Sequence, residues 1–170
     1  YLLQPLIRVD GSLFQKGLLK QKASKILSNR KLTDIDSALR LAINELSKPM
    51  PPEIRKAVIL LTDGEVDVVE GPPQRKKAAA EASKAVILTK TVYQFLKKEI
   101  PIYVVALSDD PDMDFLQKLA EYSTPPQFEK ENHFFRSPSA LDLVMIFSRI
   151  FNELRGVSVH TETYQVKGRE

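Results

Sequence analysis

The chain has 170 residues, 43% of them hydrophobic and 28% charged, and this composition predicts one globular domain with its own core. Its 25 basic residues are mixed with 22 acidic ones, so the net charge of +3 does not indicate a nucleic-acid-binding protein. The absence of cysteine excludes disulfides, thiolate metal sites and cysteine nucleophiles. Because no apolar run approaches the roughly 20 residues of a membrane-spanning helix, we expect no membrane segment in this chain.

The first third of the chain predicts a strand followed by two helices. "YLLQPLI" (residues 1–7) has the pattern of a short strand, and the turn-like "DGS" at Asp10 closes it. Residues 13–27 carry apolar side chains at helical spacing. A stronger helix is predicted for "TDIDSALRLAINELS", where Thr33 and Asp36 have the spacing of a capping box. Three apolar residues of this helix share one face: Leu39, Ile43 and Leu46.

Two apolar runs predict buried strands. "AVILLT" (residues 57–62) is short, β-branched and apolar throughout, which is typical of a parallel strand covered by helices on both faces. A long helix is predicted from about residue 75 to residue 98. "IPIYVVALS" (residues 100–108) is the next predicted strand.

The rest of the chain predicts two helices around one more strand. "DDPDMDFLQKLAEYS" opens with helix-start residues, a further short strand is expected near Phe128, and residues 137–154 form an amphipathic closing helix with Pro138 in its first turn. The alternating tail after it reads as an edge strand or as a link to another domain.

Strands that alternate with helices predict an α/β domain with a doubly wound, mainly parallel sheet and helices on both faces. Ligands of such sheets bind beyond the carboxyl ends of the strands. Asp63 and Ser108 follow two of the predicted strands directly, so both are expected at this rim of the sheet.

Five blocks resemble, in order and in spacing, the von Willebrand factor A (VWA) domain. They are "RKLTDIDSALRLAINEL", "KAVILLTDGE", "IPIYVVALS", "DFLQKLAEYS" and "LDLVMIFSRIFNEL". The resemblance implies a Rossmann-like VWA domain over residues 1–155, lacking its first strand, first helix and second strand, and a tail or linker over residues 156–170. Without those elements, the "AVILLT" strand is expected to have an unpaired apolar edge, which favours aggregation.

The family's ligand site is a metal-ion-dependent adhesion site, which usually holds Mg²⁺. Carried over by position, the resemblance implies Thr33 and Asp63 as metal ligands. The family's Asp-x-Ser-x-Ser loop has no counterpart, since "DGSLF" at Asp10 reads as a turn. We therefore expect Mg²⁺, or Mn²⁺ or Ca²⁺, in the complete domain, weak or absent binding by this chain alone, and a protein partner whose carboxylate completes the metal shell.

Simpler interpretations of these residues remain open. Thr33 can be a helix N-cap and Asp63 a turn former, while Asp34 and Asp36 are expected to be first-turn helix acids rather than ligands. Glu65 and Asp67 lie near the rim and either tune a site electrostatically or are solvated loop acids. His133 and His160 are far apart in the chain, and no pairing makes them ligands or bases.

Three functional alternatives follow. The first is a protein-binding module for adhesion or assembly, without catalysis. The second is a metal-independent VWA-like scaffold with a degenerate site. The third is a receiver-like phosphoacceptor domain with Asp63 as the acceptor, but such domains need a Lys after the fifth strand, and "VVALSDDPD" has none. No Gly-x-Ser-x-Gly or phosphate-binding glycine loop supports a hydrolase.

The lack of cysteine and the plain loops lead us to expect a bacterial, extracytoplasmic protein.

Overall fold

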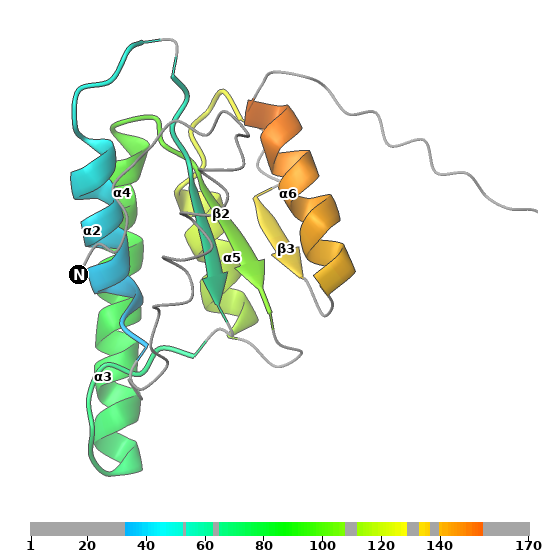
Figure 1. The fold of residues 1–170 in the computed structure, drawn as a ribbon. Helices are drawn as coiled ribbons and strands as arrows, with labels where there is room; N and C mark the ends of the chain where they lie inside the picture. The colour runs from blue at the N-terminus through cyan, green and yellow to red at the C-terminus, as the bar shows by residue number, and fades with distance from the viewer. Residues whose placement is uncertain are drawn as a thin grey trace, which may run out of the picture.

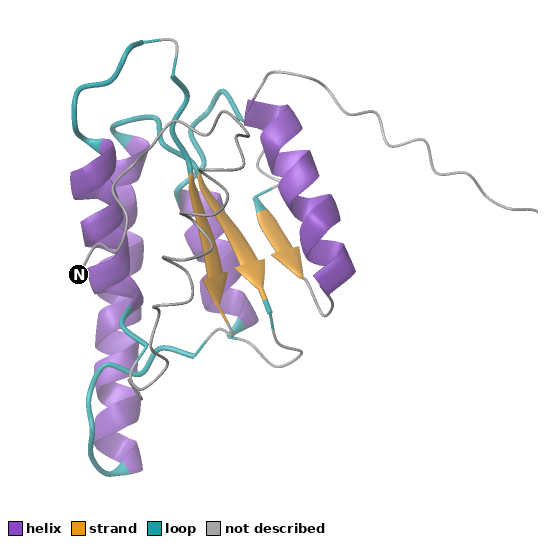
Figure 2. Ribbon diagram, in the orientation of Figure 1, coloured by secondary structure: helices purple, strands orange, loops and turns teal. Residues whose placement is uncertain are grey.

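The structure is a computed structural model of the 170-residue chain, and it describes residues 33–52, 54–62, 65–107, 112–128, 133–136 and 140–154. The strand predicted for residues 1–7, the helix predicted for residues 13–27, Pro138 and the tail lie outside these described residues. The described part is one α/β unit in which helices pack on a small sheet (Figure 2).

The sheet has three parallel strands in the order β1-β2-β3: Val58–Thr62, Ile102–Ala106 and Phe134–Arg136. Leu60 pairs with Val104, and Val105 pairs with Phe135. The predicted parallel α/β sheet is therefore confirmed. The strand expected near Phe128 was misplaced, because Phe128 instead closes a turn in which its N–H donates to the Pro125 carbonyl at 3.0 Å.

The helices cover both faces of this sheet, as predicted. Their bounds are α2 Ile35–Leu46, α3 Pro73–Val86, the π-helical turn η1 Ile87–Thr91, α4 Val92–Leu96, α5 Met113–Tyr122 and α6 Ala140–Leu154. Figure 1 shows α2, the α3–α4 rod and α5 on one side of the strands and α6 on the other. Within the described residues, no helix has the length and apolar content to cross a bilayer.

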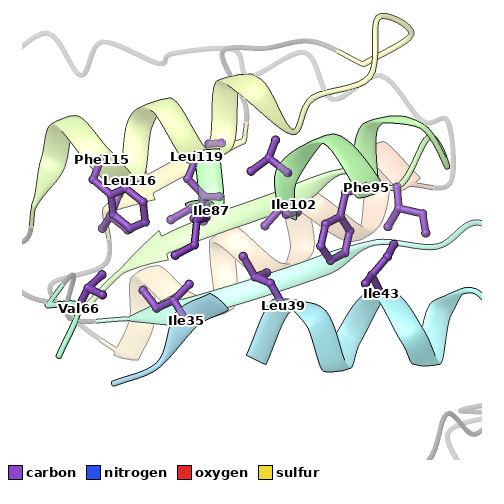
Figure 3. Packing of buried hydrophobic residues seen from close by; sticks show 14 of the residues in the cluster. Ile35, Leu39, Ile43, Val66, Ile87, Phe95, Ile102, Phe115, Leu116 and Leu119 are labelled. Atoms are coloured by element: carbon purple, nitrogen blue, oxygen red, sulfur yellow. The ribbon is translucent and has the colours of Figure 1, made fainter. Parts of the chain in front are cut away.

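The main core lies between the sheet and the first group of helices. Ile35, Leu39, Ile43 and Leu46 form the buried face of α2, which confirms the predicted apolar stripe. Figure 3 shows Leu39 and Ile43 packing toward Phe95 and Ile102. On the opposite face, Tyr103 and Val105 of β2 pack against Ile146 and Ile150 of α6 in a smaller cluster.

The long helix predicted for residues 75–98 is present but is not a continuous α-helix. The π-turn η1 interrupts it, and the N–H of Val92 bonds to the carbonyl of Ile87. An extra residue in one turn shifts the buried face, so that Ile87, Thr91 and Phe95 point into the core whereas Ala82 is exposed. The Thr91 hydroxyl donates to Asp36 and ties η1 to α2.

β1 is only half covered. Ile59 is 38% and Leu61 is 41% exposed, while β2 is buried throughout. In the described part of the sheet β1 is an edge strand, so its outer side has no described neighbour. Ile59 lines an open apolar pocket of about 440 Å³ with Phe147, Ile150 and Phe151 of α6, so the described helices cover this face of β1 only in part.

Candidate functional site

The carboxyl ends of the strands meet the start of α2 at one rim of the sheet (Figure 1). Thr33 lies just before α2 and forms an antiparallel bridge with Asp67, whose N–H donates to the Thr33 carbonyl at 3.2 Å. β1 ends at Thr62, whose carbonyl accepts a hydrogen bond from the N–H of Leu107 at 2.8 Å. The structure thus brings Thr33 to the loop that follows β1.

Asp63, the second residue implied as a metal ligand, lies outside the described residues. The preceding residue, Thr62, is the last residue of β1, and Asp67 comes four residues after Asp63 in the sequence. That Asp63 lies at the same rim as the Thr33–Asp67 bridge stays a prediction. The position of its carboxylate relative to Thr33 stays a prediction.

The N-cap of α2 is Asp34, not Thr33. The Asp34 carboxylate accepts the N–H of Ser37 at 3.0 Å and the Ser37 hydroxyl at 2.6 Å. The predicted Thr33–Asp36 capping box is therefore wrong, because the aspartate one residue later has the capping geometry. Asp36 is a first-turn acid, as expected, and pairs with Arg40 at 2.7 Å.

Lysines of α3 face the acids of the rim. Lys76 Nζ lies 3.0 Å from Asp67 Oδ2, so Asp67 is a paired acid rather than a freely solvated one. The other oxygen, Oδ1, is buried and has no hydrogen-bond partner among the described residues. An open pocket of about 400 Å³ lies here, lined by Glu65, Val66, Asp67, Lys76, Lys77, Ala80, Lys84 and Asp112.

A second ion pair closes the far side of this pocket. Lys84 hydrogen-bonds to Asp112, the N-cap of α5, and also to Glu81 at 2.9 Å. Partial burial opposes both charges, but their mutual hydrogen bond lowers the pKa of Asp112 and raises the pKa of Lys84. The pair therefore holds α5 to α3 with both groups charged at neutral pH.

The rim offers the kind of ligand that a hard cation prefers, but its described residues do not form a complete site. Carboxylate and hydroxyl oxygens suit Mg²⁺, and the buried Asp67 Oδ1 is an oxygen of this kind without a protein partner. In the described residues, however, no group of three or more His, Asp and Glu side chains could hold a metal ion. The donor chemistry fits a divalent cation, but the described residues supply too few ligands to hold one.

The sequence interpretation missed one buried polar cluster, beside α6. His133 is fully buried and is hydrogen-bonded to Glu153, 20 residues further along the chain. The apolar neighbours of His133 in the sequence indicated burial, but no local signal identified its partner.

Comparisons with known proteins agree with this fold. The solved structure of proximal thread matrix protein 1 (PTMP1) from the mussel byssus matches with a TM-score of 0.56 and 18% identity, over 90% of this chain and 33% of that one. A second crystal form of PTMP1 matches with a TM-score of 0.49, at 19% identity, over 82% of this chain and 31% of that one. The chain thus spans a third of the length of that structure. No curated protein sequence matched the chain.

The family model of the von Willebrand factor type A domain matches residues 9–149. This range contains all three strands and the helices α2 to α5, as well as most of α6. The chain therefore belongs to the von Willebrand factor type A domain family, whose members are generally protein-interaction modules.

Proposed function

We propose that this chain is a protein-binding module for adhesion or assembly, with a divalent-metal site that residues outside the chain complete. Thr33 and Asp63 are its proposed metal ligands in this chain. The observation that carries the proposal is the Thr33–Asp67 bridge, because it joins the start of α2 to the loop that contains Asp63. The module is proposed to bind without catalysis.

The proposed cation is Mg²⁺, with Mn²⁺ or Ca²⁺ as substitutes. Mg²⁺ prefers six oxygen ligands and keeps several waters, so one threonine hydroxyl and one carboxylate leave room for a ligand from another protein. When bound, the cation would supply a positive charge that a partner's carboxylate can neutralise. At the same rim Lys76 pairs with Asp67 Oδ2, and the buried Oδ1 has no hydrogen-bond partner among the described residues.

Mn²⁺ titration followed by electron paramagnetic resonance tests the proposal. The protein used carries this chain together with the remainder of its domain, and Asp63→Ala and Thr33→Val are compared with Asp114→Ala. Asp114 is an exposed acid whose ion-pair partner is Lys118, so it controls for the loss of one surface charge. We expect Asp63→Ala to weaken Mn²⁺ binding by about tenfold or more and Asp114→Ala to leave it unchanged. Equal affinity in all the variants would remove Thr33 and Asp63 from the site.

Two alternatives predict other outcomes. A metal-independent scaffold is favoured by the lysines that neutralise Asp67 and Asp112, and it would show no saturable Mn²⁺ binding in a folded protein. A receiver-like domain would form a phosphoaspartate at Asp63 with acetyl phosphate that alkali and hydroxylamine cleave, although the residue that follows β2 is Leu107 and not a lysine.

A further inference from the structure

A buried polar cluster joins α6 to the sheet on the side away from the main core. The ring of His133 lies just before β3 and is 0% exposed. Its Nδ1 is 2.9 Å from the Thr124 hydroxyl, and its Nε2 is 3.0 Å from Oε1 of Glu153 on α6. The Tyr103 ring of β2 stacks beside it, with the ring centres 4.3 Å apart.

The Thr124 hydroxyl can serve two protonation states of His133. It has one hydrogen and two neighbours, His133 Nδ1 at 2.9 Å and the Ala120 carbonyl at 2.7 Å. With neutral His133, Nε2–H donates to Glu153 and Nδ1 accepts the Thr124 hydrogen. With protonated His133, Nδ1–H donates to Thr124, whose hydrogen turns to Ala120. The ring can therefore take up a proton without losing a hydrogen bond.

The surroundings oppose a positive charge on this ring. Burial lowers the pKa of His133, and the Glu153 carboxylate offsets this only in part. Other titratable or charged groups on the elements that pack here are Tyr103 of β2, Arg149 one turn before Glu153 on α6, Arg136 at the end of β3 and the exposed Glu121 at the end of α5. Tyr103 Oη and Glu153 Oε2 are both buried without a hydrogen-bond partner in the described residues. Burial and the neighbouring Glu153 carboxylate raise the pKa of Tyr103, so its hydroxyl stays neutral and the negative charge beside His133 is that of Glu153.

Among the described residues, α6 packs on the sheet through an apolar stripe that also includes the half-buried Leu143 and Leu154. Its buried apolar residues are Ile146 and Ile150, while Val144 is 62%, Met145 60% and Phe151 59% exposed. The Glu153 end of the helix is held by the His133 hydrogen bond, by the buried Ile150 and by the half-buried Leu154, which packs in the same cluster. A movement of this end would bring water to His133.

We propose that His133 and Glu153 form a pH-responsive anchor that holds the last turns of α6 on the sheet at neutral pH and loosens them on acidification. The free ring of a histidine takes up a proton near pH 6.5, whereas the buried ring does so at lower pH. Acidification through this window therefore favours every state in which His133 meets water. The opening equilibrium of α6 can rise by up to about tenfold per pH unit.

Nuclear magnetic resonance of the full chain tests the anchor. The chain has two histidines, so His160→Gln leaves His133 as the only titrating imidazole. We expect its ring to titrate below about pH 6.5. Glu153→Gln keeps an oxygen acceptor and removes the charge, so it is expected to shift the titration further down. A midpoint at or above the free value, or an upward shift in Glu153→Gln, would overturn the proposal.

Hydrogen exchange of α6 amides, corrected for intrinsic rates, measures the opening at about pH 7.5 and about pH 5.5. We expect the opening of residues 150–154 to increase several-fold at the lower pH, and to lose this dependence in His133→Phe. Thr124→Val, which removes the second partner of the ring, gives an independent variant if His133→Phe does not fold. We expect it to raise opening at the higher pH. His160→Gln is the control and should behave as the parent chain. If the hydrogen exchange of residues 150–154 in the parent chain shows the same opening equilibrium at both pH values, the proposed anchor is wrong.

Discussion

The structure assigns the N-cap of α2 to Asp34, and this assignment can be separated from the proposed metal role of Thr33. Asp34→Ala removes a carboxylate that accepts both the backbone N–H and the hydroxyl of Ser37. Thr33→Val removes a hydroxyl while keeping the carbonyl that bonds to Asp67. The two neighbouring substitutions thus test capping and metal binding independently.

The expected cost of Asp34→Ala is about 1 kcal/mol, the usual value for losing an aspartate N-cap. That energy changes the folding equilibrium constant about fivefold, and for a domain of this size it lowers the melting temperature by about 2–4 °C. Asp34→Asn keeps the cap and loses only the charge near the helix dipole, so it should cost about 0.3 kcal/mol. Thr33→Val is expected to change stability by less than about 0.5 kcal/mol.

Urea unfolding followed by far-ultraviolet circular dichroism, without added metal, measures these differences. All three variants should unfold with the slope of the parent chain, so that the midpoints compare stability directly. If Thr33→Val costs as much as Asp34→Ala, the cap is the threonine and the assignment is wrong. If neither substitution changes the midpoint, α2 contributes little to the cooperative unit.

Three further predictions concern the core, the rim and the sheet edge. Phe95→Ala empties a fully buried position between α2 and the sheet and should cost about 3–5 kcal/mol in urea unfolding; a cost below about 1 kcal/mol would contradict the packing. Lys84→Met should destabilise the chain at neutral pH, and this difference should shrink as the pH falls below about 4 in acid titrations of stability, because protonation of Asp112 removes its pairing in both chains. A difference that grows on acidification would reverse the assigned sign. Ile59→Lys should reduce self-association in light scattering while changing stability by less than about 0.5 kcal/mol; a large loss of stability would show that another part of the chain covers this face.

Periodicity was enough to locate most elements. The apolar stripe of α2 and the uninterrupted apolar run of β2 are local patterns, and both were predicted from spacing alone. The third strand was misplaced because only three residues form it, and Phe134–Arg136 become a strand by pairing with β2. Such a short segment carries too few residues to show a period of its own.

The contacts of the site could not be predicted from the sequence. Asp63 follows an apolar strand, and the carboxyl ends of parallel strands share one rim, so the sequence predicts Asp63 at that rim. Asp63 lies outside the described residues, and its place stays a prediction. The pairing of Asp67 with Lys76, nine residues away and on another element, required the three-dimensional arrangement.

By itself, the sequence determined the α/β class, the order of the helices and strands, the family and the rim where ligands are expected. These properties follow from the spacing of apolar residues and from the order of the five sequence blocks that resemble the family, and both are local features of the sequence. Only the tertiary structure decided which aspartate caps α2, where the π-turn lies and which partner the buried His133 meets. Those outcomes depend on competition between neighbouring groups and on contacts across 20 or more residues, and hydrophobic spacing carries no information about either.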